Sequence, residues 1–460
     1  VGRLAMMPAG AASLSLALAL AGCVIAPPAP FAPLYAFVVL GPDGRAVARA
    51  IVNATTCPAI DVDGTAQPMT VRAPAQLLPQ RAGQAKPADF PVAVCEHVLA
   101  AGVQRATIGT HTLPLPKAAP SRIVVLGDTG CRLFANKNFQ FFQPCNTPAL
   151  WPFRSVAAVA AGAAPDLVIH VGDYHYRESP CPPENDSCKG SPWGYGFDAW
   201  DADFFDPARP LLAAAPWIVV RGNHETCDRA GQGWWRTLDP RPLAPRQDCN
   251  AVADDTIGDY SAPYAVPIGD DVRVLVFDSA NATNLADPPA ELVARYREQL
   301  AQAFVPASSA RTFFVVHHPP LAFAANHDHP QDPYPGNAAL QRALTPLFGP
   351  ALFPPPVTAV FSGHIHAFEA VTYSTGQPPQ LVFGDGGTAA DEPLPDPFPS
   401  GKTPLPGAVV RDLRYTIRFG FATLDRTPAG WTLTAYDITG IPMDTCTLVQ
   451  RQATCTPIAR

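Results

Sequence analysis

Five short apolar runs, each followed at once or within two residues by a polar turn, constrain the fold of this chain more than any other feature. They are Arg122–Leu126, Asp166–Val171, Trp217–Val220, Thr312–Val316 and Val357–Phe361. Runs of this length, rich in β-branched residues, are typical of strands buried on both faces of a parallel or mixed sheet. Helix-like segments lie between them at Ser155–Ala164 and Pro289–Phe304. Strands that alternate with helices predict an α/β fold with layered mixed sheets flanked by helices.

The polar turns after these runs carry the candidate functional residues. They read Gly127-Asp128-Thr129-Gly130, Gly172-Asp173-Tyr174-His175-Tyr176, Gly222-Asn223-His224-Glu225, His317-His318-Pro319 and Gly363-His364-Ile365-His366. Ligands in α/β folds collect beyond the carboxyl ends of the strands, so we expect the turns to meet. Each motif is weak by itself. Together they supply carboxylates, a phenol, an amide oxygen and imidazoles for two neighbouring metal ions, which are the usual machinery for hydrolysing phosphate esters.

From roughly Arg122 to Leu424 the set of motifs resembles the calcineurin-like metallophosphoesterases, and within them the purple acid phosphatase branch. Most relatives carry Asp-x-His in the first motif, whereas here Asp128-Thr129-Gly130 lacks the imidazole. Tyr176, three residues after Asp173, adds a phenol that keeps the number of ligands. A phenolate is a hard anionic donor, which favours a trivalent ion such as Fe(III).

The resemblance implies a dinuclear centre in which Asp173 bridges the two ions. The residues implied to hold Fe(III) are Asp128, Asp173, Tyr176 and His366. Those implied to hold the second ion, which is Zn, Mn or Fe(II), are Asp173, Asn223, His317 and His364, with His318 as the alternative to His317. It also implies a phosphoric ester hydrolase of the acid phosphatase type, acting on phosphomonoesters with metal-bound hydroxide as the nucleophile. The alternatives are a phosphodiesterase acting on nucleotides or lipid head groups, and a surface lipoprotein that binds metal without catalysis.

Several charged residues near the motifs are further candidates. His224 follows Asn223 and is expected to stabilise charge in the transition state or to protonate the leaving group. His327 lies ten residues beyond His317, where the family places another pocket histidine, and His329 competes for that role. Two arginines next to the motifs could contact phosphate or form salt bridges; they are Arg177 and Arg221.

The N-terminal residues resemble an export signal with a lipid anchor. Arg3 precedes an apolar stretch of small residues, which ends in the lipoprotein-like box Leu20-Ala21-Gly22-Cys23. We expect a signal peptide over 1–22, acylation of Cys23 and an Ala/Pro linker over 23–34; an ordinary signal peptide is the alternative. These features predict an exported protein of the bacterial periplasm or cell surface, attached to a lipid bilayer through Cys23.

The cysteine content agrees with export. Of eleven cysteines, Cys23 would take the lipid, and an even number remains for an oxidising compartment. The sequence does not determine their connectivity, and metal binding by some of them is the alternative. Neighbour spacing suggests Cys57–Cys95, Cys131–Cys145, Cys181–Cys188, Cys227–Cys249 and Cys446–Cys455.

The remaining segments are predominantly β in pattern. A small all-β domain is predicted over 35–118, and a catalytic domain over 119–460. Its C-terminal strands are expected at Tyr415–Leu424, Gly430–Asp437 and Cys446–Gln450, where they would close the sheet. The net charge of −7 and the absence of a basic run argue against a nucleic-acid polymer as partner, so a small phosphate ester is expected instead.

Overall fold

The structure is a computed structural model that describes residues 1–2, 32–304 and 310–458. The predicted signal peptide, the predicted lipidation site Cys23 and most of the linker lie outside the described residues, apart from the first two and last three positions of 1–34. Within the described ranges, no helix combines the length and the apolar character that a membrane crossing requires.

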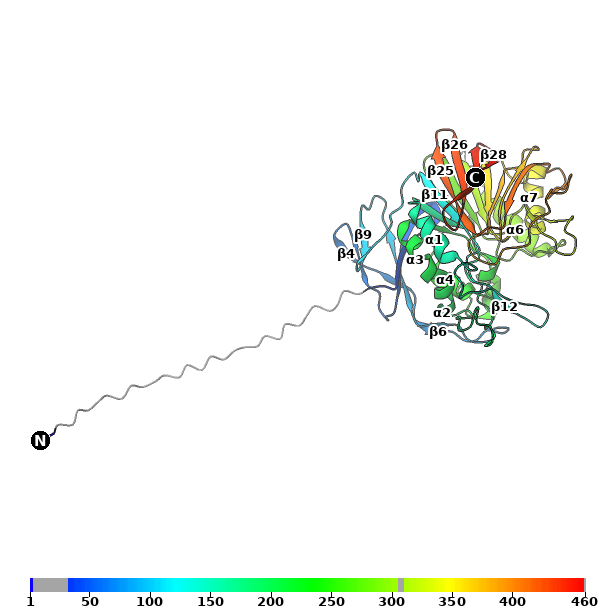
Figure 1. Ribbon diagram of the computed structural model, residues 1–460. Helices are drawn as coiled ribbons and strands as arrows, with labels where there is room; N and C mark the ends of the chain where they lie inside the picture. The colour runs from blue at the N-terminus through cyan, green and yellow to red at the C-terminus, as the bar shows by residue number, and fades with distance from the viewer. Residues whose placement is uncertain (3–31, 305–309, 459–460) are drawn as a thin grey trace. The chain divides into compact units, whose positions relative to one another are not determined.

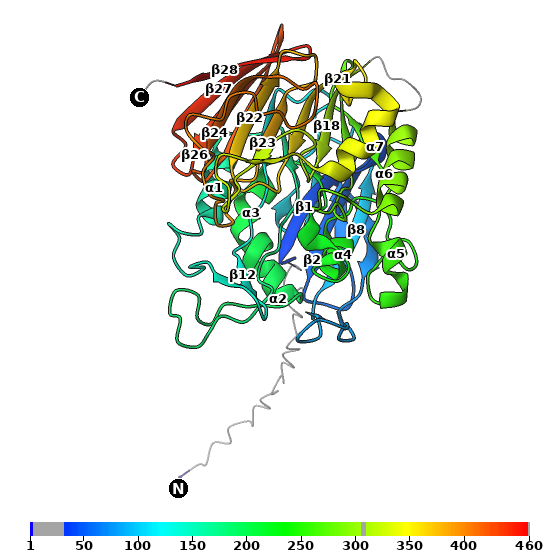
Figure 2. The same ribbon diagram turned by 90° about the vertical axis from the view of Figure 1, so that its right-hand side faces the viewer.

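Two large mixed sheets form the framework (Figures 1 and 2). The first has eleven strands in the order β28 (Gln452–Pro457), β27 (Pro442–Val449), β26 (Gly430–Asp437), β25 (Gly420–Thr427), β11 (Arg122–Leu126), β14 (Leu167–His170), β15 (Trp217–Val219), β1 (Tyr35–Leu40), β2 (Ala46–Val52), β8 (Ala93–Leu99) and β5 (Thr70–Ala73). The second has seven, in the order β16 (Tyr264–Pro267), β17 (Val272–Phe277), β18 (Arg311–Val316), β21 (Val357–Ser362), β23 (Gln380–Phe383), β22 (Phe368–Tyr373) and β24 (Val410–Thr416). Within each sheet, the strands that precede the five motifs are parallel to one another.

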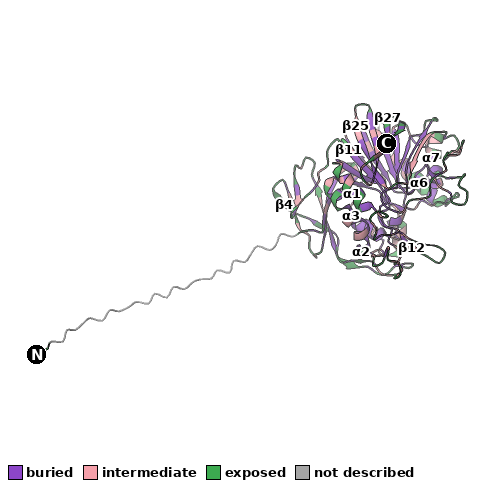
Figure 3. Ribbon diagram, in the orientation of Figure 1, coloured by how far each residue is buried: buried purple, intermediate pink, exposed green. Residues whose placement is uncertain are grey.

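Alternating side chains on the strands divide the apolar core into layers. In β11, Ile123 and Val125 belong to the core between the two sheets, together with Phe313 and Val315 of β18. The intervening Val124 faces the opposite way, toward helices α1 (Phe153–Gly162) and α3 (Asp206–Ala214). Both faces of the strand are therefore buried, as Figure 3 shows for the central strands.

The second sheet is covered in the same way on its outer face. Phe314 and Val316 of β18 pack with residues of α6 (Ala290–Ala303) and α7 (Ala338–Phe348). The layers are thus helix, sheet, sheet and helix, and the predicted layered α/β fold is confirmed.

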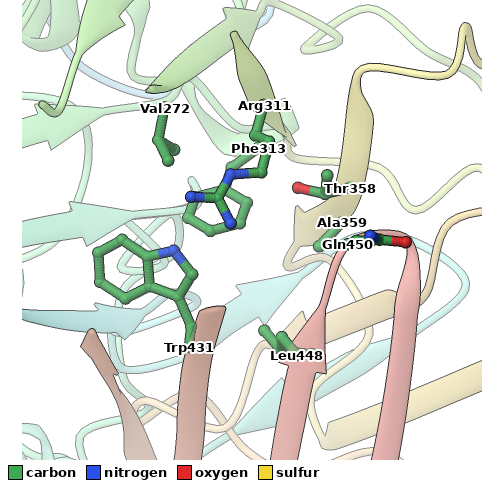
Figure 4. A pocket seen from close by; sticks show the side chains of 8 residues that line it. All are labelled: Val272, Arg311, Phe313, Thr358, Ala359, Trp431, Leu448 and Gln450. Atoms are coloured by element: carbon green, nitrogen blue, oxygen red, sulfur yellow. The ribbon is translucent and has the colours of Figure 1, made fainter. Parts of the chain in front are cut away.

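The two sheets pack closely at their interface. A cavity of about 10 Å³ remains between β17, β18 and β21 on one side and β26 and β27 on the other (Figure 4). Trp431 lies against the ring of Phe313 beside it, with centroids 5.7 Å apart. A cavity of this size has room for about one water molecule, so the interface serves as core.

The N-terminal segment extends the first sheet. Strand β1 pairs in parallel with β15, with Val39 opposite Trp217, and β2, β8 and β5 continue the sheet outward. Four further strands form a separate sheet: β3 (Ala59–Val62), β4 (Thr65–Pro68), β9 (Ala106–Ile108) and β10 (His111–Thr112). Arg49 of β2 is fully buried and donates to the carbonyl oxygens of Thr237 and Asp239, both at 2.6 Å. The segment predicted as a separate β domain therefore shares its packing with later parts of the chain, and the boundary at residue 118 stays a prediction.

One predicted strand, Tyr415–Leu424, is wrong as a single element. Strand β24 ends at Thr416 in the second sheet, and β25 begins at Gly420 in the first, where it pairs antiparallel with β11. Ile417 and Phe419 alternate with Arg418 through the connection, so the strand-like pattern continues and hides it. Gly420 is the first residue of β25 after the crossing. A Cβ at this position would lie 1.9 Å from the carbonyl oxygen of Tyr436, so the close approach requires glycine.

The five disulfides suggested by neighbour spacing are the five that form. Three of them close loops that follow the first three motifs; they are Cys131–Cys145, Cys181–Cys188 and Cys227–Cys249. Disulfides of this number are typical of proteins exported to an oxidising compartment.

Candidate metal centre

Within each sheet the strands before the motif turns are parallel to one another and end at one edge. The two edges meet, as His317 Nδ1 lies 2.9 Å from the carbonyl oxygen of Val171. Three of the predicted ligands lie in the left-handed backbone region, Asp128 with φ 53°, Asp173 with φ 58° and His364 with φ 70°. Residues other than glycine adopt this region at a cost of roughly 1–2 kcal/mol each. Such residues cluster where function requires a particular side-chain direction.

The first group of donors surrounds the phenol of Tyr176. Its oxygen lies 3.0 Å from Asp128 Oδ1, 2.9 Å from Asp173 Oδ2 and 2.9 Å from His366 Nε2. His366 Nδ1 lies 2.9 Å from the carbonyl oxygen of Ala389, so Nδ1 carries the proton and Nε2 turns a lone pair toward the phenol. One phenol hydrogen cannot satisfy three acceptors, and a cation among these four atoms would.

The second group is built around the amide oxygen of Asn223. Asn223 Oδ1 lies 3.1 Å from His317 Nε2 and 2.9 Å from His364 Nδ1. His317 Nε2 also lies 3.1 Å from Asp173 Oδ2. Candidate ligand atoms of Asp173, His317 and His364 all lie within 4.8 Å of one another. Asp173 therefore belongs to both groups, and the donors fit two neighbouring cations.

Without a cation, burial and the neighbouring charges set the pKa values of the ligand side chains. Burial, followed by the charges of Asp128 and Asp173, raises the pKa of Tyr176 well above its ordinary value. Burial lowers the pKa of His317, but the charges of Asp173 and Asp128 and the hydrogen bonds to Asp173 and Val171 together outweigh that effect and raise it to about 9. A proton on His317 thus balances part of the negative charge, and a bound cation would take its place and favour the phenolate.

Two buried carboxylates hold the turns in position. Glu225 accepts hydrogen bonds from the backbone N–H groups of Gly222, Asp173, Tyr174 and His175. Asp203 accepts from the backbone N–H groups of Cys131, Tyr176 and Arg177, and from Nε of Arg177. The second and third motifs are tied together by Glu225, and the first and second by Asp203.

His224 lies against the phenol of Tyr176, with ring centroids 3.8 Å apart. Its Nδ1 lies 2.8 Å from Glu178 Oε1, and its Nε2 lies 3.9 Å from Asp173 Oδ2. Arg229 contacts both His224 and Glu178, and it donates to the carbonyl oxygen of Asn223 at 3.2 Å. Burial and then the charge of Arg229 lower the pKa of His224 to about 4, so its imidazole is neutral at pH 7.

A cleft of about 1220 Å³ opens over the cluster. Six predicted site residues line it: Asp173, Tyr176, Asn223, His224, His364 and His366. Asp128 and His317 are fully buried beneath them. The structure therefore brings together eight of the nine residues predicted for catalysis and metal binding.

His327 is the exception. Its side chain is 82% exposed, and its Nδ1 lies 2.7 Å from Glu392 Oε1. It does not line the cleft over the cluster. The spacing of ten residues from His317 predicted a position in the pocket, but His327 lies on a surface loop. Sequence spacing by itself cannot distinguish these two positions.

The two arginines next to the motifs form buried salt bridges. Arg177 pairs with Asp203 at 2.5 Å, and Arg221 pairs with Asp278 at 2.8 Å. The cationic groups that do line the cleft are Arg132 and Arg229. Sequence reasoning missed both, since neither adjoins a predicted ligand; Arg132 does follow the first cysteine after the first motif, which is the one available signal.

A stability prediction arises at Glu369, on β22 just after the fifth motif. Its carboxylate is fully buried and accepts from the backbone N–H of Phe323 at 3.2 Å. Burial raises its pKa from 4.5 to about 8. The folded state therefore holds a proton that the unfolded chain releases, so the contribution of Glu369 to stability is complete below pH 4.5 and is lost as the pH rises toward 8.

Replacement Glu369→Gln should consequently raise the Tm relative to the parent protein at about pH 9 and change it little at about pH 4. Thermal melts at both pH values provide the measurement. The exposed Glu298 offers a matched control, and Glu298→Gln should show no such pH-dependent difference. A Tm difference for Glu369→Gln that is equal at both pH values would contradict the assignment.

Comparisons with known proteins agree with this geometry. A family model described as calcineurin-like phosphoesterase matches residues 121–368, which is more than half of the chain. No curated protein sequence matches significantly. The solved structure of purple acid phosphatase PPD1 from seeds of yellow lupin (Lupinus luteus) is 17% identical with a TM-score of 0.54, covering 90% of this chain and 74% of that one. The solved structure of PhoD is 11% identical with a TM-score of 0.54, covering 94% of this chain and 93% of that one. At these identities the two structures show a shared fold.

Proposed function

The chain belongs to the calcineurin-like phosphoesterase family and is a phosphoric ester hydrolase; on that premise we propose that it hydrolyses phosphomonoesters at a centre of two metal ions. The family implies bound divalent metal ions. The observation that carries the dinuclear assignment is the position of Asp173 Oδ2, which lies 2.9 Å from the phenol oxygen of Tyr176 and 3.1 Å from Nε2 of His317. A carboxylate oxygen shared by two donor groups is suited to bridge two cations.

The chain's own donors divide into two sets around that carboxylate. The residues proposed to hold the first ion, Fe(III), are Asp128, Asp173, Tyr176 and His366. Those proposed to hold the second, which is Zn, Mn or Fe(II), are Asp173, Asn223, His317 and His364. When bound, the two ions supply Lewis acidity, which lowers the pKa of a coordinated water and neutralises charge on the phosphoryl group.

The protein side chains then orient the ester. His224 is neutral at pH 7, since burial and Arg229 lower its pKa to about 4. Its Nδ1 lies 2.8 Å from Glu178 Oε1 and 2.6 Å from Arg229 Nη2, and its Nε2 is on the side of Asp173. We therefore assign His224 to hydrogen bonding within the bound phosphate complex and not to protonation of the leaving group. Arg132 adds a positive charge to the cleft near Tyr176.

The choice of monoester can be tested directly. A monoester is a dianion near neutral pH and a diester a monoanion, so the cationic groups of the cleft attract the monoester more strongly. We expect kcat/KM for p-nitrophenyl phosphate to exceed that for bis(p-nitrophenyl) phosphate by at least about tenfold, which corresponds to about 1.4 kcal/mol. Faster hydrolysis of the diester would overturn the proposal.

The iron assignment has a spectroscopic test. A phenolate bound to Fe(III) absorbs visible light, so Tyr176→Phe should lose that absorption while keeping a parent-like Tm. Tyr174 is a matched control, because it is equally buried and its hydroxyl faces the carbonyl oxygen of His170 at 3.5 Å. Tyr174→Phe should retain the absorption. A colourless parent protein that contains only divalent ions by elemental analysis would refute Fe(III) while leaving two metals possible.

A further inference from the structure

Exposed apolar side chains gather at the mouth of the cleft. Leu285 is 58% exposed and Tyr334 is 54% exposed, and both line the cleft above the metal-ligand cluster. Phe134 and Tyr195 line it as well and are half-buried. Large apolar side chains left exposed beside a concave polar site are typical of a surface that binds a ligand.

The exposed pair is held in place by contacts to the ligand turns. Asn284, directly before Leu285, has its Oδ1 3.1 Å from Nε2 of His364. Tyr334 belongs to the short strand β20 (Tyr334–Pro335), which pairs with β19 (Phe323–Ala324). Asn337 Nδ2 donates to the carbonyl oxygen of Thr283 at 3.0 Å and so joins the two loops. The apolar surface is thus fixed relative to the predicted phosphate position.

Charge is scarce beyond that position. Arg229 is committed to Glu178 and His224. Arg132 lies 6.0 Å from the ring centroid of Phe141, and its buried Nε has no hydrogen-bond partner within the described ranges. The acidic residues Asp228 and Asp391 also line the cleft. One uncommitted arginine suits a single phosphoryl group, and the described lining of the cleft holds no further free lysine or arginine for a second phosphate or a carboxylate.

We infer that the substrates are phosphomonoesters of apolar alcohols, and that Leu285 and Tyr334 determine this specificity by contacting the alcohol group. The inference rests on the proposed phosphomonoesterase function. Burial of apolar surface contributes about 25 cal/mol per Å², so each methylene that enters the cleft strengthens binding.

The test is a series of n-alkyl phosphates from methyl to butyl, assayed by phosphate release with the metal-loaded protein. We expect kcat/KM to rise about threefold for each added methylene, mainly through KM. Propyl phosphate should also be a better substrate than glycerol phosphate, which has the same number of carbons and two hydroxyl groups. A flat series, or a preference for glycerol phosphate, would overturn the inference while methyl phosphate hydrolysis upholds the proposed function.

Variants assign the effect to the surface. The double replacement Leu285→Ser and Tyr334→Ser should reduce the ratio of kcat/KM for butyl over methyl phosphate by at least about fivefold. Val98→Ser is the control, because Val98 is 48% exposed on β8 and does not line the cleft; it should leave the ratio unchanged. An unchanged ratio in the double variant would refute the role of these two residues. Failure to cleave any ester would overturn the proposed function and this inference with it.

Discussion

Replacing Asp173 with asparagine is expected to abolish hydrolysis and to release both metal ions. The change keeps the size of the side chain and removes the negative charge that the two donor groups share. Groups that merely orient a metal ligand cost about 10–100-fold in metal affinity or activity when removed. Asp173 contacts Tyr176 and His317 directly, so Asp173→Asn should lower kcat/KM by more than about 100-fold.

Elemental analysis and kcat/KM for p-nitrophenyl phosphate measure both parts of this result. Asp287 provides the control, because its side chain is 88% exposed and pairs with Arg342. Asp287→Asn should retain metal content and rate. An Asp173→Asn protein that keeps half of the parental rate would contradict the bridging role.

The second large effect is expected at Gly222, directly before Asn223. A Cβ there would lie 2.0 Å from Asp173 Oδ1 and 2.4 Å from the backbone nitrogen of Asp173. The backbone of Gly222 has φ −96°, which alanine adopts readily, so the requirement for glycine is one of space. Gly222→Ala must displace Asp173, and a displacement of about 1 Å at a reacting centre can cost about 100-fold in rate.

We expect Gly222→Ala to lose at least about 100-fold in kcat/KM and about 1–3 kcal/mol of stability, as overpacking commonly does. Kinetics, metal content and thermal melts test the three consequences. Gly162 at the end of α1 is the matched control, because a Cβ there meets no atom within 4 Å. Gly162→Ala should leave the rate unchanged, and equal behaviour of the two variants would refute the close-approach argument.

The sequence alone determined the framework that carries the site. Short apolar runs predicted β11, β14, β15, β18 and β21 within one or two residues, since strands buried on both faces leave a continuous apolar signal. Parallel strands of one sheet end at the same edge, so the turns within each sheet were expected to converge, and the packing of the two sheets brought the two sets of turns together. Neighbour spacing likewise predicted the disulfides, because short loops bring their cysteines together regardless of the rest of the fold.

Only the tertiary structure decided which partner each charged side chain meets. Arg177 and Arg221 adjoin the motifs yet pair with Asp203 and Asp278, which lie 26 and 57 residues further along the chain. The crossing of the chain between the two sheets at 417–419 was hidden for the same reason. Periodicity and spacing are local properties, while the partner of a charge or the sheet of a strand depends on distances between segments far apart in the chain. The apolar pattern of the sequence therefore predicted where the metal-ligand turns lie, and long-range packing determined which side chains surround them.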